Sequence, residues 1–208
     1  MRESLLDCAV DHFGRFGFEG AATRAIAADC GTAMSSITYH FGSKEGLYLA
    51  AADHIAAQMT EHHRPALEAI RAAPASSPEE AIAQLVSLLD MMAATMLGEK
   101  SARWTRFITR EQQEPTEAFD RIFRAAMSPM VEAFVHLVAI ARPELTAREQ
   151  RATGFLMFGQ VLALRAGRAS LFRVLEIERL DADSETLLRR QLAVHVRLIL
   201  SAPPETAR

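Results

Sequence analysis

Hydrophobic residues recur along most of this chain at intervals of three and four, the spacing that gathers them on one side of an α-helix. Near the N-terminus, Leu6, Val10 and Phe13 follow this spacing and predict a helix from Arg2 to about Phe16, which Gly17 ends. No stretch shows the strict alternation of hydrophobic and polar residues that is typical of a strand. The pattern therefore predicts an all-α fold.

The next stretch predicts two short helices joined by a tight turn. Thr23 is the expected N-cap of the first, which runs to Cys30, and Gly31 stands where a helix commonly ends in a left-handed residue. The second should begin near Ala33, with Ile37 turned inward and short polar side chains on its outer side. Two short helices in this arrangement form a helix-turn-helix, whose second helix enters the major groove in DNA-binding proteins.

Helix caps and breakers predict a longer helix and then a helical bundle. The longer helix should begin at Lys44, where Ser43 can cap it, and Pro65 should limit or kink it. The later helices are expected to begin or end at Ser77, Gly98, Ala102, Gln113, Glu117, Pro129, Pro143, Thr146, Gly167 and Asp181. Residues 168–180 look less regular. We expect a three-helix domain over residues 1–46 and a helical domain over residues 47–208.

Length and composition describe a globular chain. Its 208 residues are 50% hydrophobic, enough to bury a sizeable core. No run approaches the roughly 18 uninterrupted apolar residues of a membrane span, and the charged N-terminus does not resemble a signal peptide, so we expect a cytoplasmic protein without a membrane partner. Cys8 and Cys30 lack metal-ligand spacing and are expected to be reduced, partly buried thiols.

The charge balance does not by itself indicate nucleic-acid binding. The net charge is −3, and residues 1–47 hold four basic and six acidic side chains, a balance of −2. Because affinity for any DNA sequence depends on Lys and Arg at the phosphates, this count favours weak non-specific binding. Sequence-specific binding stays open, since helix N-termini also contact phosphates.

Catalytic and metal-binding patterns are missing from the sequence. There is no GxSxG elbow, P-loop or HExxH motif. The adjacent His62 and His63 point to different sides of a helix and predict a solvated surface, so we expect neither a metal nor a cofactor. A helical enzyme with an unrecognised site is the weaker alternative.

The stretch TRAIAADCGTAMSSITYHFGSKEGL, residues 23–47, resembles the DNA-binding domain of the TetR family of bacterial transcriptional regulators. The matching positions are Thr23, Ile26, Ala27, Gly31, Ile37, Tyr39, His40, Phe41, Ser43, Lys44 and Leu47. Ala33 departs from the usual capping Ser, and Thr32 could cap instead. Residues 103–172, especially RFITREQQEPTEAF and FGQVLALRAGRA, look like the C-terminal domain of the CecR-like subgroup.

The resemblance implies a ligand-responsive regulator, most simply a repressor that binds a palindromic operator in double-stranded DNA. The residues expected to contact bases are Met34, Ser35, Ser36 and Thr38. Those expected to contact phosphates are Thr23, Arg24, Tyr39, His40 and Lys44. The alternative from another class is a helical ligand- or partner-binding protein that does not bind DNA.

The resemblance also implies a homodimer and a small hydrophobic effector. We expect the last two helices, residues 147–165 and 184–200, to pair with their mates, with Leu192 and Val196 in the interface. An effector cavity is expected to be lined by Met91, Met92, Met96, Trp104, Phe107, Phe119, Phe123 and Met127. The alternatives are that these helices and side chains are ordinary core.

Overall fold

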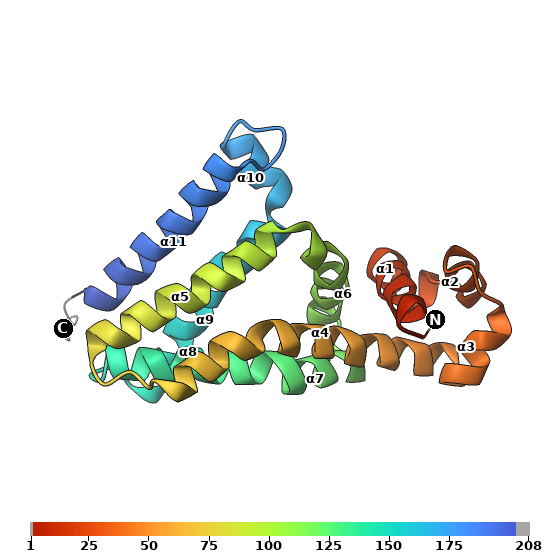
Figure 1. The fold of residues 1–208 in the computed structure, drawn as a ribbon, viewed down its shortest axis with the longest axis horizontal. Helices are drawn as coiled ribbons and strands as arrows, with labels where there is room; N and C mark the ends of the chain where they lie inside the picture. The colour runs from red at the N-terminus through yellow and green to blue at the C-terminus, as the bar shows by residue number, and fades with distance from the viewer. Residues whose placement is uncertain (1, 203–208) are drawn as a thin grey trace. The chain divides into compact units, whose positions relative to one another are not determined.

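The computed structural model describes residues 2–202, without the side chain of Lys100, and within that range every regular element is a helix (Figure 1). The all-α prediction is confirmed. The described residues pack as two compact units, one of residues 2–63 with 102–129 and one of residues 64–101 with 130–202. These packing units do not coincide with the expected functional domains, 1–46 and 47–208, so that functional boundary stays a prediction.

The first unit begins with α1 (Arg2–Gly20), which is four residues longer than the expected helix. Gly17 has a φ of 72°, a left-handed value that glycine adopts at little cost, and it interrupts the helix as expected. The helix α2 (Thr23–Asp29) follows. Its N-cap is Ala22, in an extended conformation, so the prediction that Thr23 is the N-cap is wrong by one residue.

The turn into α3 (Met34–Phe41) follows the expected pattern at its start. Gly31 has a φ of 67°, and the N–H of Thr32 donates to the carbonyl of Ala27 at 2.9 Å, which closes the end of α2. Ala33 is the N-cap of α3 and makes no side-chain capping bond. Thr32 does not replace it, because its hydroxyl donates to the Ser36 hydroxyl at 3.0 Å instead.

The helix α4 (Lys44–Ala72) begins directly after the helix-turn-helix. Ser43 caps it as expected, its Oγ accepting the N–H of Gly46 at 3.0 Å. Pro65 lies inside this helix, so the expectation that it would limit the helix is wrong. Within the first unit, the buried face of α4 includes Leu47, Ala51 and Ile55.

The first unit is completed by α6 (Ala102–Gln113), α7 (Glu117–Ile122) and a π-helical turn (Phe123–Met127). Pro129 follows this turn and has no N–H to donate to the carbonyl of Ala125 four residues earlier. The hydroxyl of Thr60 on α4 donates to that carbonyl at 3.2 Å. A side chain of α4 thus satisfies the acceptor that the proline leaves open.

The second unit contains the end of α4, α5 (Pro78–Leu97), a short 3₁₀ turn (Glu99–Ser101) and the helices α8 (Ser128–Ala141), α9 (Ala147–Ala166), α10 (Arg168–Val174) and α11 (Ala182–Ser201). The helix α10 lies in the stretch that the sequence left irregular. Its first residue, Arg168, donates to the carbonyl of Leu97 at 2.8 Å and pairs with Glu99 at 2.9 Å. Contacts distant in sequence therefore support this short helix.

The predicted caps of the second unit are confirmed. Ser77 accepts the N–H of Glu80 at 3.2 Å, and Asp181 accepts the N–H of Ser184 at 2.8 Å. Thr146 and Glu149 form both arms of a capping box. Each of these side chains accepts a backbone donor that the first turn of a helix leaves open.

The core of the second unit explains the apolar character of its helices. By length and composition alone, Pro78–Leu97 and Glu117–Ala141 could cross a membrane, but core helices pass the same test. Leu85, Leu88 and Leu89 of α5 are at most 1% exposed and pack in the hydrophobic core. The buried face of α5 therefore accounts for much of its hydrophobicity.

Candidate nucleic-acid interface

The helix α3 is held by one face and leaves the other open. Ile37 is 2% exposed and is the buried side chain of this helix, with Ile26 and Ala27 of α2 also buried. Of the residues predicted to contact bases, Met34, Ser35 and Thr38 are exposed and Ser36 is half-buried. The outer side of α3 therefore presents short polar groups and one flexible apolar side chain.

The residues predicted to contact phosphates lie on α2, α3 and α4. Arg24, Tyr39 and His40 are exposed, Tyr39 to 84%, and Thr23 and Lys44 are half-buried. Tyr39 and His40 pack edge to face, with ring centres 4.9 Å apart, at the end of α3. Their roles in DNA binding remain predictions, and their exposure is what those roles require.

Lys44 makes contacts within its own unit. Its Nζ donates to the carbonyl of Glu19 at 3.1 Å and lies 4.8 Å from the centre of the Phe18 ring. An ammonium over an aromatic face is stabilised by the negative charge density of the ring. Lys44 thus joins the start of α4 to the end of α1.

Two histidines on the helices behind the interface pair with carboxylates. His12 Nε2 of α1 lies 2.6 Å from Asp29 of α2, and His54 Nε2 of α4 lies 2.9 Å from Asp7 of α1. These contacts link the supporting helices, whereas α3 itself contributes no partner to either pair.

A buried carboxylate on α6 joins three helices of the first unit, and sequence reasoning missed it. Glu111 is 2% exposed, and one of its oxygens accepts the hydroxyl of Tyr48 on α4. The other accepts the Thr116 hydroxyl at 2.7 Å and the N–H of Phe119 at 3.0 Å, at the start of α7. Burial, together with the hydrogen bond to Glu111, raises the pKa of Tyr48 above its ordinary value.

The sequence did contain a signal for this position. Trp104, Phe107, Ile108 and Glu111 follow the spacing i, i+3, i+4, i+7 of a buried helix face, and all four are buried. A glutamate at the fourth position of such a face needs several donors, because burying a carboxylate without partners is costly. The burial of Glu111 could have been predicted from the sequence, but the identity of its hydrogen-bond donors could not.

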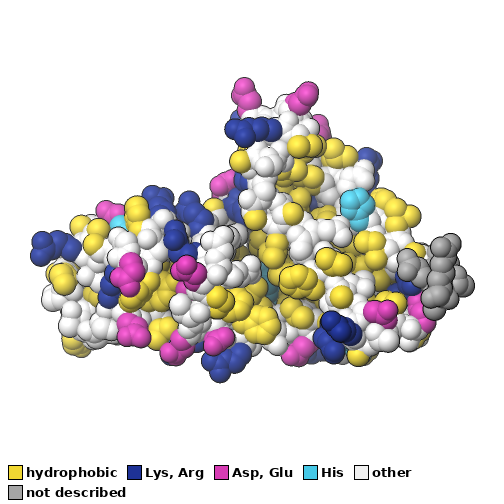
Figure 2. Space-filling model, turned by 180° about the vertical axis from the view of Figure 1, so that it is seen from behind, with side chains coloured by type: hydrophobic (Ala, Val, Ile, Leu, Met, Phe, Trp, Pro, Cys, Tyr) yellow, Lys and Arg dark blue, Asp and Glu magenta, His cyan; other side chains and the backbone are white. Residues whose placement is uncertain are grey.

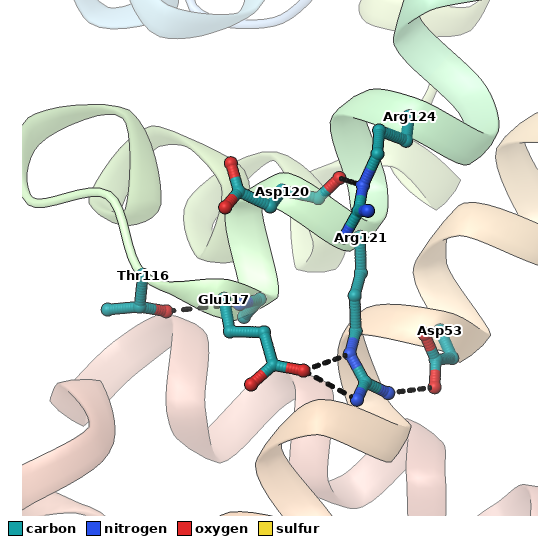
Figure 3. A network of polar contacts seen from close by, with 7 residues as sticks. Asp53, Thr116, Glu117, Asp120, Arg121 and Arg124 are labelled. Carbon is teal, nitrogen blue, oxygen red and sulfur yellow. Dashed lines mark hydrogen bonds and ion pairs between the residues drawn. The ribbon is translucent and has the colours of Figure 1, made fainter.

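A second network ties α7 to α4 (Figure 3). The guanidinium of Arg121 donates to Glu117 at 2.7 and 3.0 Å and reaches Asp53 of α4 at 2.8 Å. On the next turn, Arg124 donates to the carbonyl of Asp120 at 3.2 Å. Glu111, Arg121 and Thr60 therefore fasten α7 and the π-helical turn along α4.

The eight residues predicted to line an effector cavity fall in both compact units. Those of α5 belong to the second unit and the other five to the first. Met92, Met96, Trp104, Phe107 and Met127 are buried, Met91 and Phe119 are half-buried, and Phe123 is 40% exposed. None of them lines the hollow of about 460 Å³ in the first unit. Their role in binding stays a prediction.

The paired histidines of α4 differ from the expected solvated surface. His62 is exposed, but His63 is 4% exposed and its Nδ1 has no hydrogen-bond partner among the described atoms. Burial, and secondarily the nearby His62, lowers the pKa of His63 to about 4. No cluster of three or more potential metal ligands occurs among the described residues.

The cysteines are free and half-buried, as expected. Burial, and then a hydrogen bond with Cys30, raises the pKa of the Cys8 thiol to about 11. A thiol with a raised pKa is a poor nucleophile at neutral pH. Cys8 is therefore best described as a small packing group beside Cys30, where α1 meets the end of α2.

The outer faces of α9 and α11 carry exposed hydrophobic side chains. Phe155 and Leu156 of α9 are 66% and 67% exposed, and Leu198 of α11 is 67% exposed. The two helices meet where His195 Nδ1 lies 3.1 Å from Gln160. Figure 2 shows hydrophobic side chains spread over one face of the second unit. Where exposed hydrophobic side chains form a contiguous patch, that patch is typical of an interaction surface.

Two residues that we expected in a dimer interface lie inside the single chain. Leu192 and Val196 are 6% and 1% exposed and belong to the core of the second unit. The expectation for these two positions is wrong, because the strongest apolar stripe of α11 packs inside its own chain. A pairing surface on α11 must use the other side of the helix.

Two family models match this chain. The bacterial regulatory proteins of the tetR family match residues 5–51, and the C-terminal domain of the HTH-type transcriptional dual regulator CecR matches residues 80–202. CecR of Shigella flexneri is 31% identical over 204 residues, 96% of this chain and 91% of that protein. The regulatory protein RaaS of Mycobacterium tuberculosis is 39% identical over 64 residues, which are 31% of this chain and 30% of RaaS.

Solved structures share the fold across nearly the whole chain. A TetR-like transcriptional regulator from Rhodococcus sp. RHA1 superposes with a TM-score of 0.65 at 22% identity, covering 97% of each chain. The fatty acid degradation regulator FadR from Bacillus halodurans gives a TM-score of 0.63 at 16% identity, covering 98% of this chain and all of that one. At these identities the likeness concerns the fold alone.

Proposed function

We propose that this chain, which belongs to the TetR family of DNA-binding transcriptional regulators and carries a CecR-type C-terminal domain, is a repressor that binds a palindromic operator as a homodimer. A small hydrophobic effector releases it. The observation that carries the proposal is the outer face of α3, where Thr38 and Ser35 are exposed while Ile37 anchors the helix. Because the chain belongs to a family of transcriptional regulators, the alternative of a helical enzyme is set aside.

Base recognition rests on short side chains in the proposed complex. Ser35, Ser36 and Thr38 offer hydroxyl groups that can donate to or accept from base edges, and Met34 offers an apolar contact. Thr23, Arg24, Tyr39, His40 and Lys44 would hold phosphates on either side. Because residues 1–47 carry a formal charge of −2, the non-specific part of the affinity should be small. Contacts to the bases would then supply a larger share of the total affinity for the operator.

A homodimer follows from the size of the DNA-binding domain. One helix-turn-helix reads few base pairs, and two copies about one helical turn apart read a palindrome. We place the dimer interface on α9 and α11, because Phe155, Leu156 and Leu198 expose apolar surface that a second copy can cover. In a two-fold interface, the same patch contributes from both chains.

In the proposed mechanism, a small hydrophobic effector releases the protein from its operator. The candidate lining residues are those named from the sequence, Met91, Met92, Met96, Trp104, Phe107, Phe119, Phe123 and Met127. Methionine side chains are flexible and polarisable, so a wall rich in them suits varied hydrophobic compounds. A ligand that prefers the non-binding arrangement by about 3 kcal/mol would weaken operator binding more than a hundredfold.

Effector coupling can be tested with N-phenyl-1-naphthylamine, a neutral hydrophobic probe, and the fluorescence of Trp104. The chain has one tryptophan, so the signal reports one position. We expect the probe to change the fluorescence and to release operator DNA over the same concentration range. If the fluorescence change saturates while the operator affinity stays the same, the probe binds the protein but its binding does not control DNA affinity.

Repression can be tested by transcription in vitro from the promoter of the chain's own gene. We expect the transcript level to fall as the protein is added. We also propose that the chain acts in the cytoplasm, where it has access to chromosomal DNA. The relative CecR is described as a dual regulator. A rise in transcript would make this chain an activator at that promoter.

A further inference from the structure

The first unit contains a hollow of about 460 Å³. It lies between the end of α1, the first turns of α4, and the segment that joins α6 to α7. Three aromatic side chains, Phe16, Phe18 and Tyr48, contribute to its wall. A hollow of this size matches the volumes of small-molecule sites, which start at about 300 Å³.

The aromatic wall already receives one positive charge from the chain itself. Lys44 places its ammonium 4.8 Å from the centre of the Phe18 ring, and Phe18 is one of the side chains that line the hollow. The Phe18 and Tyr48 rings meet edge to face, with centres 5.1 Å apart, so these two walls hold each other in position. A preformed aromatic surface of this kind stabilises cations over its faces.

The charged groups of the hollow are mostly acidic. Five glutamates and one arginine line it, a formal balance of −4. Arg110 donates to the carbonyl of Arg15 at 3.2 Å, and Glu117 pairs with Arg121 at 2.7 Å. Glu45 and Glu114 have no ion-pair partner among the described side chains. The hollow therefore attracts positive charge, and local pairing removes only part of this attraction.

The Glu111 side chain, which is 2% exposed, is one of the groups that line the hollow. All of its described partners are neutral donors, from Tyr48, Thr116 and Phe119. Hydrogen bonds satisfy its oxygens but do not cancel its charge. A cation in the hollow would supply that compensation from the open side.

The shape of the site favours an organic cation over a metal ion. No three potential metal ligands cluster closely enough to hold a metal among the described residues. The carboxylates are instead distributed around aromatic walls, which suits a ligand whose charge is spread over an apolar body. A compact, strongly hydrated metal ion would gain little from Phe16 or Phe18.

We propose that this hollow is a binding site for an organic cation with a hydrophobic, preferably aromatic body. The aromatic walls receive the body, and Glu45, Glu111 and Glu114 provide the field that holds its charge. The proposal goes beyond DNA recognition and concerns a different set of residues from the predicted effector cavity. It is tested on the protein without DNA, so its failure leaves the regulator proposal untouched.

The sharpest probe is a pair of ions of nearly equal size and shape with opposite charge, tetraphenylphosphonium and tetraphenylborate. Titration calorimetry of the full chain should show tetraphenylphosphonium binding at least about tenfold more tightly than tetraphenylborate, and the cation should bind more weakly as salt rises. Equal binding of both ions, or no binding of the cation, would overturn the proposal.

Variants locate the site. Glu45→Gln with Glu114→Gln removes two exposed charges and should weaken tetraphenylphosphonium binding by about tenfold. The matched control, Glu178→Gln with Asp183→Asn, removes two exposed charges from the second unit and should leave binding unchanged. Circular dichroism confirms that each variant is folded. Equal binding by both double variants would place the cation elsewhere and reject this site.

Discussion

Lys44 combines a structural contact with a proposed phosphate contact. Its ammonium already bonds the carbonyl of Glu19, so the side chain is held near the start of α4. We predict that Lys44→Ala weakens binding to operator and scrambled DNA alike and lowers the slope of log affinity against log salt by about one. Fluorescence anisotropy at several salt concentrations measures both quantities.

Two variants control this prediction. Arg173→Ala removes an exposed cation from α10 and should leave the salt slope unchanged. Thr38→Ala should instead change the preference between operator sequences, by about 1 kcal/mol or more at the contacted base pair. If Lys44→Ala alters sequence preference as Thr38→Ala does, the division between phosphate and base contacts is wrong.

His63 makes the stability of the protein depend on pH. Its pKa is lowered to about 4 in the folded chain, against an ordinary value of 6.5. Below pH 6.5 the unfolded chain therefore takes up a proton that the folded chain does not, and stability falls as the pH drops toward 4. We predict that this group alone removes about 2 kcal/mol between pH 7.5 and pH 5.

The contribution of His63 can be isolated by urea unfolding at both pH values. His63→Gln should reduce the loss of unfolding free energy on acidification by about 2 kcal/mol, whereas the exposed neighbour variant His62→Gln should not. An unchanged loss in His63→Gln would mean that the buried imidazole is protonated in the folded chain.

Single residues also show which structural features could be predicted from the local sequence. The position of Gly31 was predictable, because a helix end next to a polar turn needs a left-handed residue there. The cap of α2 was missed by one residue, because the cap preference of threonine favoured Thr23, whereas the extended residue before the helix is Ala22. The burial of His63 was missed because adjacent helix positions look alike in sequence, and only packing decides which one turns inward.

At the scale of elements, α7 depends on a carboxylate from another helix. Glu111 accepts donors from Thr116 and Phe119 at the start of α7 and from Tyr48 on α4. We predict that Glu111→Ala lowers the free energy of unfolding by about 2–4 kcal/mol, because several buried donors lose their acceptor. The control Glu114→Ala removes an exposed carboxylate three residues away and should cost less than about 0.5 kcal/mol.

Chemical unfolding with urea measures this difference. Similar losses in Glu111→Ala and Glu114→Ala would show that water replaces the missing acceptor at little cost. The network would then be incidental to the stability of α7.

The proposed pairing of α9 and α11 is tested on their exposed faces. Phe155→Glu and Leu198→Glu each place a charge in the proposed interface, where burial without a partner is costly. We predict that either variant weakens dimerisation by about a hundredfold and leaves the monomer folded. The control Val174→Glu changes a side chain that is 79% exposed on α10 and should leave the dimer intact.

Sedimentation velocity at micromolar concentration gives the oligomeric state of each variant. If the wild-type protein is a monomer at this concentration, the proposed homodimer is contradicted. A dimer that survives both Phe155→Glu and Leu198→Glu would move the interface to another surface.

Element boundaries were predictable where the determining contacts are local. The caps at Ser77, Thr146 and Asp181 involve residues within three or four positions, so their sequence patterns carry the information. The helix α10 was missed because Arg168 supports it through contacts with residues 97 and 99, about 70 positions earlier. Nothing in its local pattern reports those contacts.

At the scale of the whole molecule, the sequence predicted the fold class and the helix-turn-helix, and the family comparisons bear out both. The grouping of residues 102–129 with the N-terminal helices was not predictable. It depends on contacts such as that between Arg106 and Asp11, 2.8 Å apart but 95 positions distant in sequence. The hollow lined by Phe16 and Glu114 arises from the same grouping, so no local motif reveals it.

The central claim is that the exposed face of α3 reads a specific operator. Its most direct test is a mobility-shift titration with DNA from the promoter of the chain's own gene, against a scrambled duplex of equal length at the same salt concentration. We predict a discrete complex of two chains per duplex, at least about a thousandfold tighter on promoter DNA. Equal affinity for both duplexes would contradict sequence recognition by α3 at this promoter.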